Sequence, residues 1–375
     1  MIIELEELVK NGEIEIKTGP FGTQLKAAEY VESGTPVLNV KNLGYSTVVT
    51  TKVDYVGEKT LERLSMHILK EGDIVFGRKG AVDRHAYIGA NEAGWMQGSD
   101  CIRLRVKTNK INPRYLSYYF LTPKHKAFMI SMCSHGTTMA SLNQGILSKI
   151  EIDLPERCIQ DRIVSIIAVL DKKRKTNEKL NKNLEQQAQA IYSRMFIEHR
   201  QESWSTGQLS DLISVKYGKD HKKLADGNYP VYGSGGIMRY VEKPLYTCES
   251  VLIPRKGTLN NIMYVNEAFW SVDTMFYTEM LRPNIAKFVY HFVKSKDLVS
   301  LNAGSAVPSM TTNILNAMQL YIPNEKTLEK FENIVSPMYS AMQENTKESK
   351  ILANTRDALL PKLMSGELDV SDIDL

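Results

Sequence analysis

Two stretches of the chain carry apolar residues at alternating intervals of three and four positions. The first runs from Ile163 to Met195, and the second runs from Phe331 to Leu363, 168 residues further on. Such spacing places the apolar side chains on one face of an α-helix and is typical of a coiled-coil seam. We therefore predict two long helices that pack against each other. The expected interface residues are Ile163, Ile167, Leu170, Asn177, Leu184 and Ile191 in the first helix and Val335, Met338, Met342, Asn345, Leu352 and Leu359 in the second.

Both stripes become polar in the middle, and prolines mark the helix starts. Each stretch follows a proline, Pro155 or Pro323, which suits the first turn of a helix. If the helices pack antiparallel, Asn177 comes close to Asn345, and a buried asparagine pair sets the register at a cost in stability. The alternative is that both asparagines tolerate a loosely packed, solvated middle. Pro337 is expected to kink the second helix or to end its first turn.

The segments before the two helices, 1–155 and 201–323, contain short β-rich runs broken by glycine, asparagine and aspartate, and one helical stretch each. This mixture predicts an α+β fold with two α/β globules, each built on a twisted sheet, separated by two long antiparallel coiled-coil helices. The expected strands are 35–40, 73–76, 101–106, 250–253 and 275–278, and the expected helical stretches are 113–130 and 283–298.

The two halves of the chain repeat each other. The shift between matching residues is 168 from residues 152–155 onward, grows to 177 at Arg78-Lys79-Gly80, and reaches 204 at Leu5. A period of this length indicates duplication of a whole domain, with a pseudo-two-fold internal repeat, rather than a solenoid. The predicted boundaries are 1–155 and 201–323 for the globules, 156–200 and 324–366 for the helices, and 367–375 for an acidic tail.

Composition narrows the class of protein. The 375 residues include 47 basic and 43 acidic side chains and 43% hydrophobic residues, as in an ordinary water-soluble protein. No apolar stretch reaches the ~18–20 residues of a membrane span, and the acidic start does not resemble a secretory signal. The four cysteines are far apart, without zinc-site spacing. We therefore expect a cytoplasmic protein with no metal site.

The net charge of +4 is distributed unevenly along the chain. Residues 156–200 contribute +4, each globule contributes +2, and residues 324–375 contribute −4. The excess sits on the first long helix, where Lys172-Lys173-Arg174-Lys175 forms a basic run. We expect this run to be solvated or to face a protein partner. The alternative is that it lies over DNA.

Two non-identical globules spaced by a helix pair suit a long polymer with two recognition patches, and DNA is the obvious example. Basic loops containing glycine follow strands in both halves, and lysine or arginine neutralises phosphates while arginine and asparagine can bind purine edges. The alternative for each loop is a solvated surface turn. The candidate DNA contacts are Lys17, Thr18, Phe21, Asn39, Lys41, Asn42, Arg78, Lys79, Arg84, His85, Lys216, Tyr217, Lys219, Arg255, Lys256, Asn260 and Asn261.

Catalytic motifs are matched only in part. Residues 112–115, Asn-Pro-Arg-Tyr, differ from the amino-methyltransferase motif at Arg114, and we predict a helix start there instead. Glycines 233–236 lack the spacing of a dinucleotide fingerprint, and the phosphate-binding Gly-x-x-x-x-Gly-Lys-Ser/Thr pattern is absent. Glu15-x-Lys17 has no acidic partner upstream of the kind a nuclease needs. We expect no catalytic residue and no cofactor in this chain.

The sequence resembles the specificity subunits of type I restriction–modification systems over essentially its whole length. The resemblance rests on Leu154-Pro155 with Gln160 and Ile163, on the basic glycine turn in each half, and on the path from Gly304-Ser305 through Ile314 to Ile322-Pro323. Above all it rests on residues 356–368, Arg-Asp-Ala-Leu-Leu-Pro-Lys-Leu-Met-Ser-Gly-Glu-Leu. Leu328 stands where the first half has Gln160, so a local contact at that helix start is expected to differ.

This resemblance implies that 1–155 and 201–323 are target recognition domains, each recognising one half of a bipartite, asymmetric site on double-stranded DNA. It implies that the helices set the spacing and dock two modification subunits, and that a restriction subunit can join. S-adenosylmethionine, ATP and magnesium are expected on those partners. Two alternatives remain at this point: a coiled-coil adaptor that binds proteins but not DNA, and a stand-alone nuclease or methyltransferase, against which the missing motifs argue.

Overall fold

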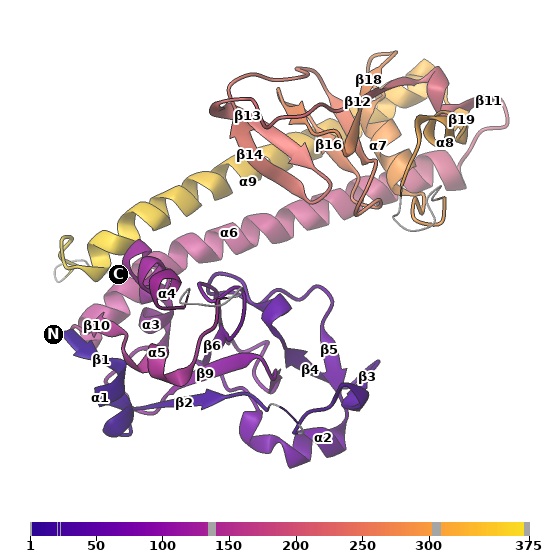
Figure 1. The fold of residues 1–375 in the computed structure, drawn as a ribbon. Helices are drawn as coiled ribbons and strands as arrows, with labels where there is room; N and C mark the ends of the chain where they lie inside the picture. Colours follow the sequence, from indigo (N-terminus) through magenta and orange to yellow (C-terminus); the bar gives the residue numbers. More distant parts are fainter. Residues whose placement is uncertain (1, 21, 23, 134–139, 302–308, 371–375) are drawn as a thin grey trace. The chain divides into compact units, whose positions relative to one another are not determined.

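The computed structural model describes residues 2–20, 22, 24–133, 140–301 and 309–370 (Figure 1). The chain divides into two compact units. Unit 1 is Met1–Lys175 with Glu348–Leu375, and unit 2 is Thr176–Lys347. Each unit therefore combines one globule with parts of both long helices, so the predicted helical segments 156–200 and 324–366 are shared between the units.

The part of unit 1 that the structure describes contains ten strands. They are β1 (Ile2–Glu4), β2 (Ile14–Thr18), β3 (Tyr30–Val31), β4 (Thr35–Leu38), β5 (Asp54–Val56), β6 (Ile74–Gly77), β7 (His85–Tyr87), β8 (Met96–Gln97), β9 (Cys101–Val106) and β10 (Glu151–Asp153). One antiparallel sheet has the order β2-β9-β6-β7, a second has the order β3-β5-β4-β8, and β1 pairs with β10. In the second sheet β4 and β8 are parallel.

The helices of the first globule are short. They are α1 (Leu5–Lys10), α2 (Glu58–Arg63), α3 (Pro113–Tyr119), α4 (Pro123–Cys133) and α5 (Gln144–Ser148). The Asn112 side chain accepts hydrogen bonds from the backbone nitrogens of Arg114 (2.8 Å) and Tyr115 (3.4 Å), and Pro113 occupies the first turn of α3. The predicted helix start is confirmed, because this is the arrangement of an N-cap followed by proline.

Unit 2 contains nine strands within the described residues. They are β11 (Ser205–Gln208), β12 (Ile213–Tyr217), β13 (Asp226–Gly233), β14 (Gly236–Val241), β15 (Ser250–Pro254), β16 (Met263–Val265), β17 (Trp270–Ser271), β18 (Met275–Met280) and β19 (Gln319–Ile322). The sheets have the orders β12-β18-β15-β16, β14-β13-β17 and β11-β19. The helices of this globule are α7 (Ala286–Lys294) and α8 (Thr312–Asn316).

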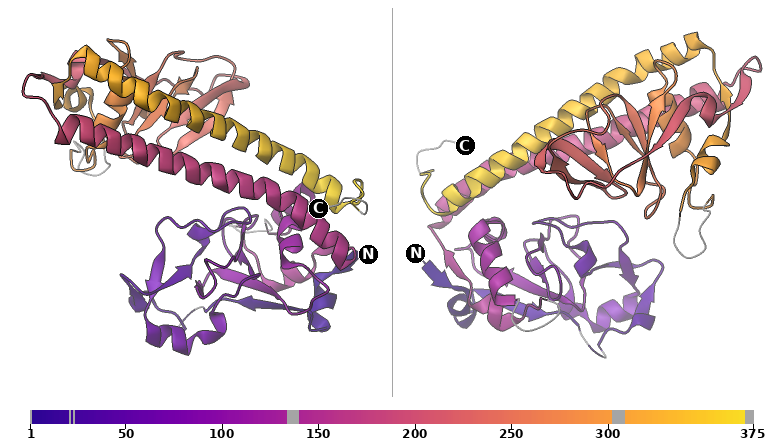
Figure 2. Two further views of the ribbon diagram at one scale, coloured as in Figure 1. Left: turned by 180° about the vertical axis from the view of Figure 1, so that it is seen from behind. Right: turned by 45° about the horizontal axis from the view of Figure 1, so that its top comes forward.

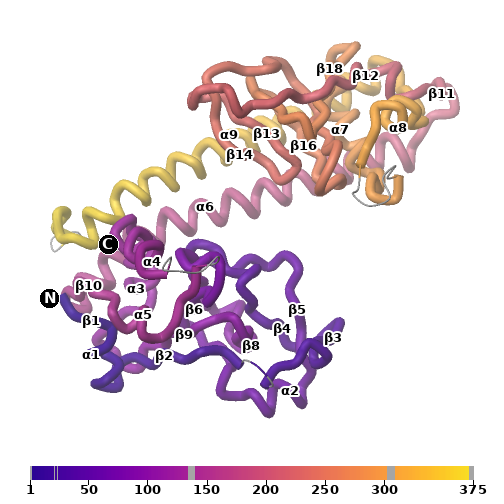
Figure 3. Tube along the Cα trace, in the orientation of Figure 1, coloured from indigo at the N-terminus to yellow at the C-terminus, as the bar shows by residue number. Residues whose placement is uncertain are grey.

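The sheets of the two globules match in strand order, apart from β3, which has no counterpart among the described strands of unit 2, and this match confirms the predicted duplication. The order β2-β9-β6-β7 corresponds to β12-β18-β15-β16, and β5-β4-β8 corresponds to β14-β13-β17, including the parallel pair. The halves differ in one place above all (Figure 3). Residues 39–53 connect β4 to β5 in unit 1, whereas β13 turns into β14 through residues 234 and 235 alone. The 13-residue difference between these connections accounts for about a third of the 36-residue change in the repeat shift.

The strands and helices lie close to their predicted positions, with two local differences. The predicted helix over 113–130 is split into α3 and α4. The predicted helix over 283–298 starts only at Ala286, since Asn284 adopts a left-handed φ of 60° that ends any helical path from Pro283. The first difference is a break inside the predicted helix, where Pro123 opens α4, and the second concerns a helix start, which is harder to place than the helix itself.

The two long helices are α6 (Arg157–Tyr192), which continues into a π-helical turn (Ser193–Glu198), and α9 (Glu325–Met364). Within each unit the two segments run antiparallel and side by side (Figure 2). In unit 1, Lys173 Nζ lies 3.3 Å from Glu348 Oε2. In unit 2, later residues of α6 contact earlier residues of α9. The antiparallel helix pair predicted from the stripes is confirmed.

Asparagines connect the two helices in unit 2. Asn177 Nδ2 donates to the carbonyl oxygen of Asn345 (3.3 Å), and the Asn177 side chain is fully buried. Asn345 Nδ2 donates to Asn181 Oδ1 (2.9 Å), and Asn181 Nδ2 donates to the carbonyl oxygen of Met342 (3.1 Å). Asn177 therefore lies against Asn345 as the paired alternative predicts, although it bonds to the backbone of Asn345, and the side-chain pair is formed by the half-buried Asn345 and Asn181. Amide contacts of this kind between two helices favour one register over others.

The predicted interface residues are all at least partly buried. Ile163, Ile167 and Val335 are fully buried, and they pack into the cores of the globules as well as against the other helix. In each unit the apolar helix ends thus belong to the same core as the sheet. The remaining predicted positions are half-buried, apart from the buried Asn177, and they are Leu170, Leu184, Ile191, Met338, Met342, Asn345, Leu352 and Leu359.

Pro337 does not end a turn, contrary to one of its two predicted effects. Helix α9 continues without interruption from Glu325 to Met364. A proline inside a helix removes one backbone hydrogen bond and costs about 3 kcal/mol. The neighbouring residues Val335 and Tyr339 are buried in the core of unit 2, and this burial offsets the loss.

The two helix starts differ as Gln160 and Leu328 predict. The buried Gln160 side chain accepts from the backbone nitrogen of Asn112 (2.8 Å) and donates to the carbonyl oxygens of Lys110 (3.1 Å) and Pro155 (2.8 Å). In unit 2, Leu328 is buried in the apolar core instead. Unit 1 therefore fastens its helix start by hydrogen bonds, and unit 2 does so by apolar packing.

Candidate nucleic-acid interface

A glycine loop follows β2 in the sheet β2-β9-β6-β7 of unit 1, and an equivalent loop follows β12 in the sheet β12-β18-β15-β16 of unit 2. The backbone nitrogen of Gly19 donates to the carbonyl oxygen of Cys101 (2.8 Å), and that of Gly218 donates to Met275 (3.0 Å). A Cβ added at Gly19 would lie 2.0 Å from the carbonyl oxygen of Gly98, and one at Gly218 would lie 2.0 Å from that of Val272. Both loops therefore depend on glycine because two backbones approach closely.

In unit 1 the basic loop that follows β6 is held from both sides. The backbone nitrogen of Arg78 donates to the carbonyl oxygen of Asp100 (2.8 Å), and Leu142 donates to the carbonyl oxygen of Arg78 (2.8 Å). Lys79 forms an isolated antiparallel bridge with Ser141. The Lys79 side chain is exposed, and no residue that the structure describes forms an ion pair with it.

The basic loop after β15 in unit 2 repeats these contacts. The backbone nitrogen of Arg255 donates to the carbonyl oxygen of Thr274 (2.9 Å), and Met310 donates to the carbonyl oxygen of Arg255 (2.9 Å). Lys256 bridges Ser309 as Lys79 bridges Ser141. The residues around the two loops differ, yet the same backbone hydrogen bonds and the same bridge hold both loops. A loop kept in one conformation in both units is suited to presenting side chains to a ligand.

In unit 2 the glycine loop after β12 and the basic loop after β15 lie against each other. The Arg255 guanidinium lies 5.4 Å from the centre of the Tyr217 ring, which is 52% exposed and packs edge-on against Phe276. Lys219 is exposed one residue beyond the glycine, whereas Lys216 is paired with Glu279 (3.3 Å). An exposed tyrosine among cations is a suitable surface for nucleic acid, because the cations bind phosphate and the ring packs on sugar or base.

The corresponding residues of unit 1 are partly engaged in the protein itself. The carbonyl oxygen of Lys17 accepts a hydrogen bond from Gln97 Nε2 (3.0 Å), and Thr18 Oγ1 accepts one from Gln144 Nε2 (3.0 Å). The Lys17 side chain remains half-buried. Phe21 lies outside the described residues.

The three candidates after β4 mainly hold their own loop. Asn39 Nδ2 donates to Asp54 Oδ2 (2.7 Å), and Lys41 Nζ lies 2.7 Å from the same carboxylate. Asn42 is fully buried and donates to the carbonyl oxygen of Val49 (2.9 Å). The assignment of Asn42 to DNA contact is therefore wrong, because an enclosed amide cannot reach a base. Lys41 and Asn39 remain accessible but already have an acidic partner.

His85 is also a structural residue. Its side chain is 1% exposed, packs against Phe76 and Phe120, and places Nε2 3.0 Å from Ser117 Oγ. Burial lowers the pKa of His85 to about 3, so the imidazole is neutral near pH 7. The assignment of His85 to DNA contact is wrong. Its neighbour Arg84 is exposed and remains a candidate.

Asn260 and Asn261 support the basic loop of unit 2 rather than extend from it. Asn260 Nδ2 donates to Asp297 Oδ1 (3.1 Å), and Asn260 Oδ1 accepts from the backbone nitrogen of Leu298 (2.9 Å). Asn261 Nδ2 donates to the carbonyl oxygen of Ser234 in the β13–β14 turn (2.8 Å). Both amides use these groups internally, so the exposed Lys256 and the Arg255 guanidinium, which among the described residues donates only to the carbonyl oxygen of Asp273 (3.2 Å), are better candidates for DNA contact.

In unit 1, Tyr45 and Lys126 lie beside the candidate Arg84, and neither was among the predicted contacts. Tyr45 lies in the long β4–β5 connection, and Lys126 lies on α4 with its Nζ 4.7 Å from the centre of the Tyr45 ring. The two residues are 81 positions apart, and neither belongs to a motif. Only the fold brings them together.

Two further features concern the described part of the chain. No group of three or more histidine, cysteine, aspartate or glutamate side chains within it is arranged to hold a metal ion. None of the helices in the same residues is long and apolar enough to cross a membrane.

Replacing Gly218 by alanine should destabilise unit 2 by about 1–3 kcal/mol, because the new Cβ would overlap backbone atoms of β17 and its loop. Urea unfolding followed by circular dichroism measures this change. Gly235→Ala is the matched control, since an added Cβ there meets nothing within 4 Å. Equal stability of the two variants would contradict the close approach at Gly218.

Comparison with known proteins agrees with this fold. The model for the type I restriction modification DNA specificity domain matches residues 7–186 and 201–353. The MjaIX specificity subunit of a type I restriction enzyme from Methanocaldococcus jannaschii is 21% identical, over 93% of this chain and 90% of its own length. The putative MjaX specificity subunit from the same organism is 25% identical, over 90% and 88%.

The crystal structure of the type I restriction–modification S subunit from M. genitalium has a similar fold, with a TM-score of 0.58 and 17% identity over 99% of this chain and 96% of its own. The predicted mixed α and β architecture, with two globules and long helices, is thereby confirmed. The family model covers both globules and most of both helices. The chain therefore belongs to the family of type I restriction–modification specificity subunits and is a DNA specificity subunit.

Proposed function

We propose that the first globule, residues 1–155, and the second, residues 201–323, are target recognition domains that each bind one half of a bipartite, asymmetric DNA site. The observation that carries this is the pair of basic loops, one after β6 and one after β15, which are anchored by equivalent backbone hydrogen bonds in the two units. The sequences around these loops differ, so the two half-sites differ as well. The side chains proposed to face DNA are Lys79, Arg84, Tyr217, Lys219, Arg255 and Lys256, together with Arg78, Lys17 and Thr18.

The long helices have a different role in this proposal. They set the spacing between the half-sites and dock two modification subunits, and a restriction subunit joins the same assembly. Specificity subunits are generally non-catalytic. The adenine methylation and the ATP-dependent cleavage would therefore be performed by the partners, which would hold S-adenosylmethionine, ATP and magnesium. The antiparallel pairing of the helix segments within each unit supports their role as a spacer, and in unit 2 the asparagine contacts add to it.

Methylation sequencing of the host genome tests this function. Adenine methylation is expected at one bipartite motif with two different halves and a fixed gap, and it should disappear when the gene for this chain is deleted. Restoring the gene is the control and should restore the motif. Methylation of that motif without the gene, or methylation or cleavage of DNA by the purified chain alone, would contradict the proposal.

A further inference from the structure

Tyr45 lies on the surface of unit 1 between two cations. Its ring is 43% exposed. The Arg84 guanidinium lies 5.5 Å from the ring centre, and Lys126 Nζ lies 4.7 Å from it. The tyrosine hydroxyl donates to Asp83 Oδ2 (2.8 Å), which fixes the outer end of the ring. No residue that the structure describes forms an ion pair with Arg84 or Lys126, so both cations are available to an anionic ligand.

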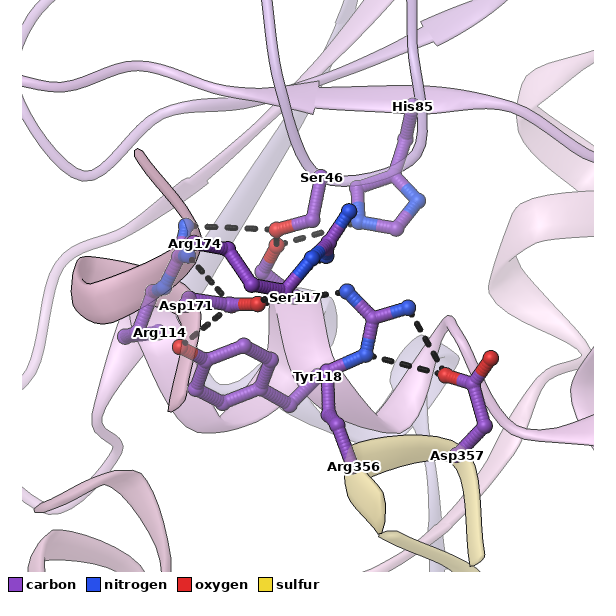
Figure 4. A network of polar contacts seen from close by, with 9 residues as sticks. All are labelled: Ser46, His85, Arg114, Ser117, Tyr118, Asp171, Arg174, Arg356 and Asp357. Atoms are coloured by element: carbon purple, nitrogen blue, oxygen red, sulfur yellow. Dashed lines mark hydrogen bonds and ion pairs between the residues drawn. The ribbon is translucent and has the colours of Figure 1, made fainter. Parts of the chain in front are cut away.

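Hydrogen bonds to the protein interior hold Ser46, the residue after Tyr45. Ser46 is buried and adopts a left-handed φ of 58°. Its backbone nitrogen donates to the carbonyl oxygen of His85 (2.9 Å), and its Oγ lies 2.6 Å from Ser117 Oγ. The Ser117 hydroxyl in turn lies 3.0 Å from His85 Nε2 (Figure 4). Because an unusual backbone angle is fixed by buried contacts on both sides, the loop has one preferred conformation.

Arg114 connects this loop to the long helices within unit 1. Its Nη1 lies 3.2 Å from Ser46 Oγ, and its Nη2 lies 3.5 Å from Asp171 Oδ2 on α6. The other oxygen of Asp171 lies 3.2 Å from Arg356 Nη1 on α9 (Figure 4). Tyr118 OH donates to Asp171 Oδ2 (3.0 Å). A carboxylate with this many partners holds the arginine in one position.

Unit 2 has no equivalent of this loop within its described residues, because β13 turns directly into β14 through residues 234 and 235. The arrangement of Tyr45 between Arg84 and Lys126 is therefore found, among the described residues, in the first domain alone. A contact made by it would affect recognition of one half-site and leave the other unchanged.

We propose that Tyr45 contacts a base edge in the half-site bound by the first domain, flanked by phosphate contacts from Arg84 and Lys126. Ser46, Arg114 and Asp171 are the residues that position it. The inference rests on the proposed function. An exposed ring between two unpaired cations suits DNA, because phosphates satisfy the cations while the ring packs against a base.

The test begins with the complex of the full chain and its modification subunits, bound to a duplex that carries the motif mapped by methylation sequencing. Two further duplexes have one half-site or the other replaced. Tyr45→Ala should weaken binding to the intact duplex about 5- to 100-fold, as loss of one contact to a base edge does. It should bind like the wild type to one of the two altered duplexes, the one that lacks its half-site. Val49→Ala, at an exposed residue of the same connection, is the control and should change nothing.

The outcomes separate this inference from the function beneath it. If no bipartite motif is mapped, both fail. If a motif is mapped but Tyr45→Ala binds the intact duplex like the wild type, the inference fails alone. It also fails if Tyr45→Ala loses the same factor on all three duplexes, since that would indicate loss of non-specific affinity.

Positioning is tested by combining variants. Ser46→Gly removes the hydroxyl while glycine keeps the left-handed backbone, and Asp171→Asn removes the charge that holds Arg114. Each should weaken binding about 3- to 10-fold in the wild-type background and cause no further loss in the Tyr45→Ala background. Losses that simply add would show a general structural role and overturn the positioning assignment. The unfolding midpoint of each variant confirms that the protein remains folded.

Discussion

Replacing Arg78, Lys79, Arg255 and Lys256 together by alanine should weaken DNA binding about 1,000-fold near 0.1 M salt. Each lysine or arginine that neutralises a phosphate releases counterions, and each such contact contributes about 0.9 to the slope of log K against log salt concentration. The slope should therefore fall by about 3 to 4. A salt titration by fluorescence anisotropy, using the mapped duplex, measures both quantities.

A matched control keeps the same net charge change but moves it away from the loops. Lys10 and Lys59 in unit 1 and Lys243 and Lys330 in unit 2 are exposed and lie outside both basic loops. Their combined replacement by alanine should lower the slope by less than about 1. Variants in only one loop should each give about half of the full effect. An unchanged slope in the four-residue loop variant would reject the DNA contacts and favour the coiled-coil adaptor.

Replacing Lys287 by methionine should lower the free energy of unfolding by about 3–5 kcal/mol. Lys287 is 4% exposed, and its Nζ lies 2.6 Å from Glu332 Oε1 on α9 and 3.0 Å from Glu249 Oε1. Without the ammonium group, two partly buried carboxylates lose their counterion while remaining poorly solvated. Denaturant unfolding of the full chain at pH 8 measures the loss.

The pH dependence of this variant distinguishes lost charge from lost packing. Protonation neutralises an uncompensated carboxylate, so the deficit of Lys287→Met should shrink between pH 8 and pH 5. The control is Lys294→Met in the same helix, whose partner Glu185 is 37% exposed and which should lose about 0–1 kcal/mol. A deficit that stays constant with pH would show that Lys287 acts through packing alone.

The helices, the strands and the duplication could be predicted from the sequence because they depend on local patterns. The three-four spacing of Ile163, Ile167 and Val335 requires a buried helical face whatever that face packs against. Gly19 and Gly218 follow a strand in each half, and the internal repeat places them in equivalent loops. These features depend on residues that are close together in the chain.

The candidate site could be predicted only in part. A lysine or arginine beside a loop glycine is visible in the sequence, and Lys79 and Lys256 are indeed exposed. Asn42 and His85 have the same local appearance, yet both are enclosed. Exposure depends on which distant segments cover a side chain, and residue type does not encode it. For the same reason the sequence alone could not identify Tyr45 as a candidate DNA contact.

Hydrophobic periodicity and repeat spacing are enough to establish that this chain is one globule-plus-helix unit used twice, because both are properties of the amino-acid sequence alone. The way each globule is attached to its helices depends on contacts that form only in the folded chain. Unit 1 uses the carboxylate of Asp171 between Arg114 and Arg356, whereas unit 2 uses the ammonium of Lys287 between Glu249 and Glu332. These partners lie tens of residues apart or more, and such charges become neighbours only when packing removes the water between them.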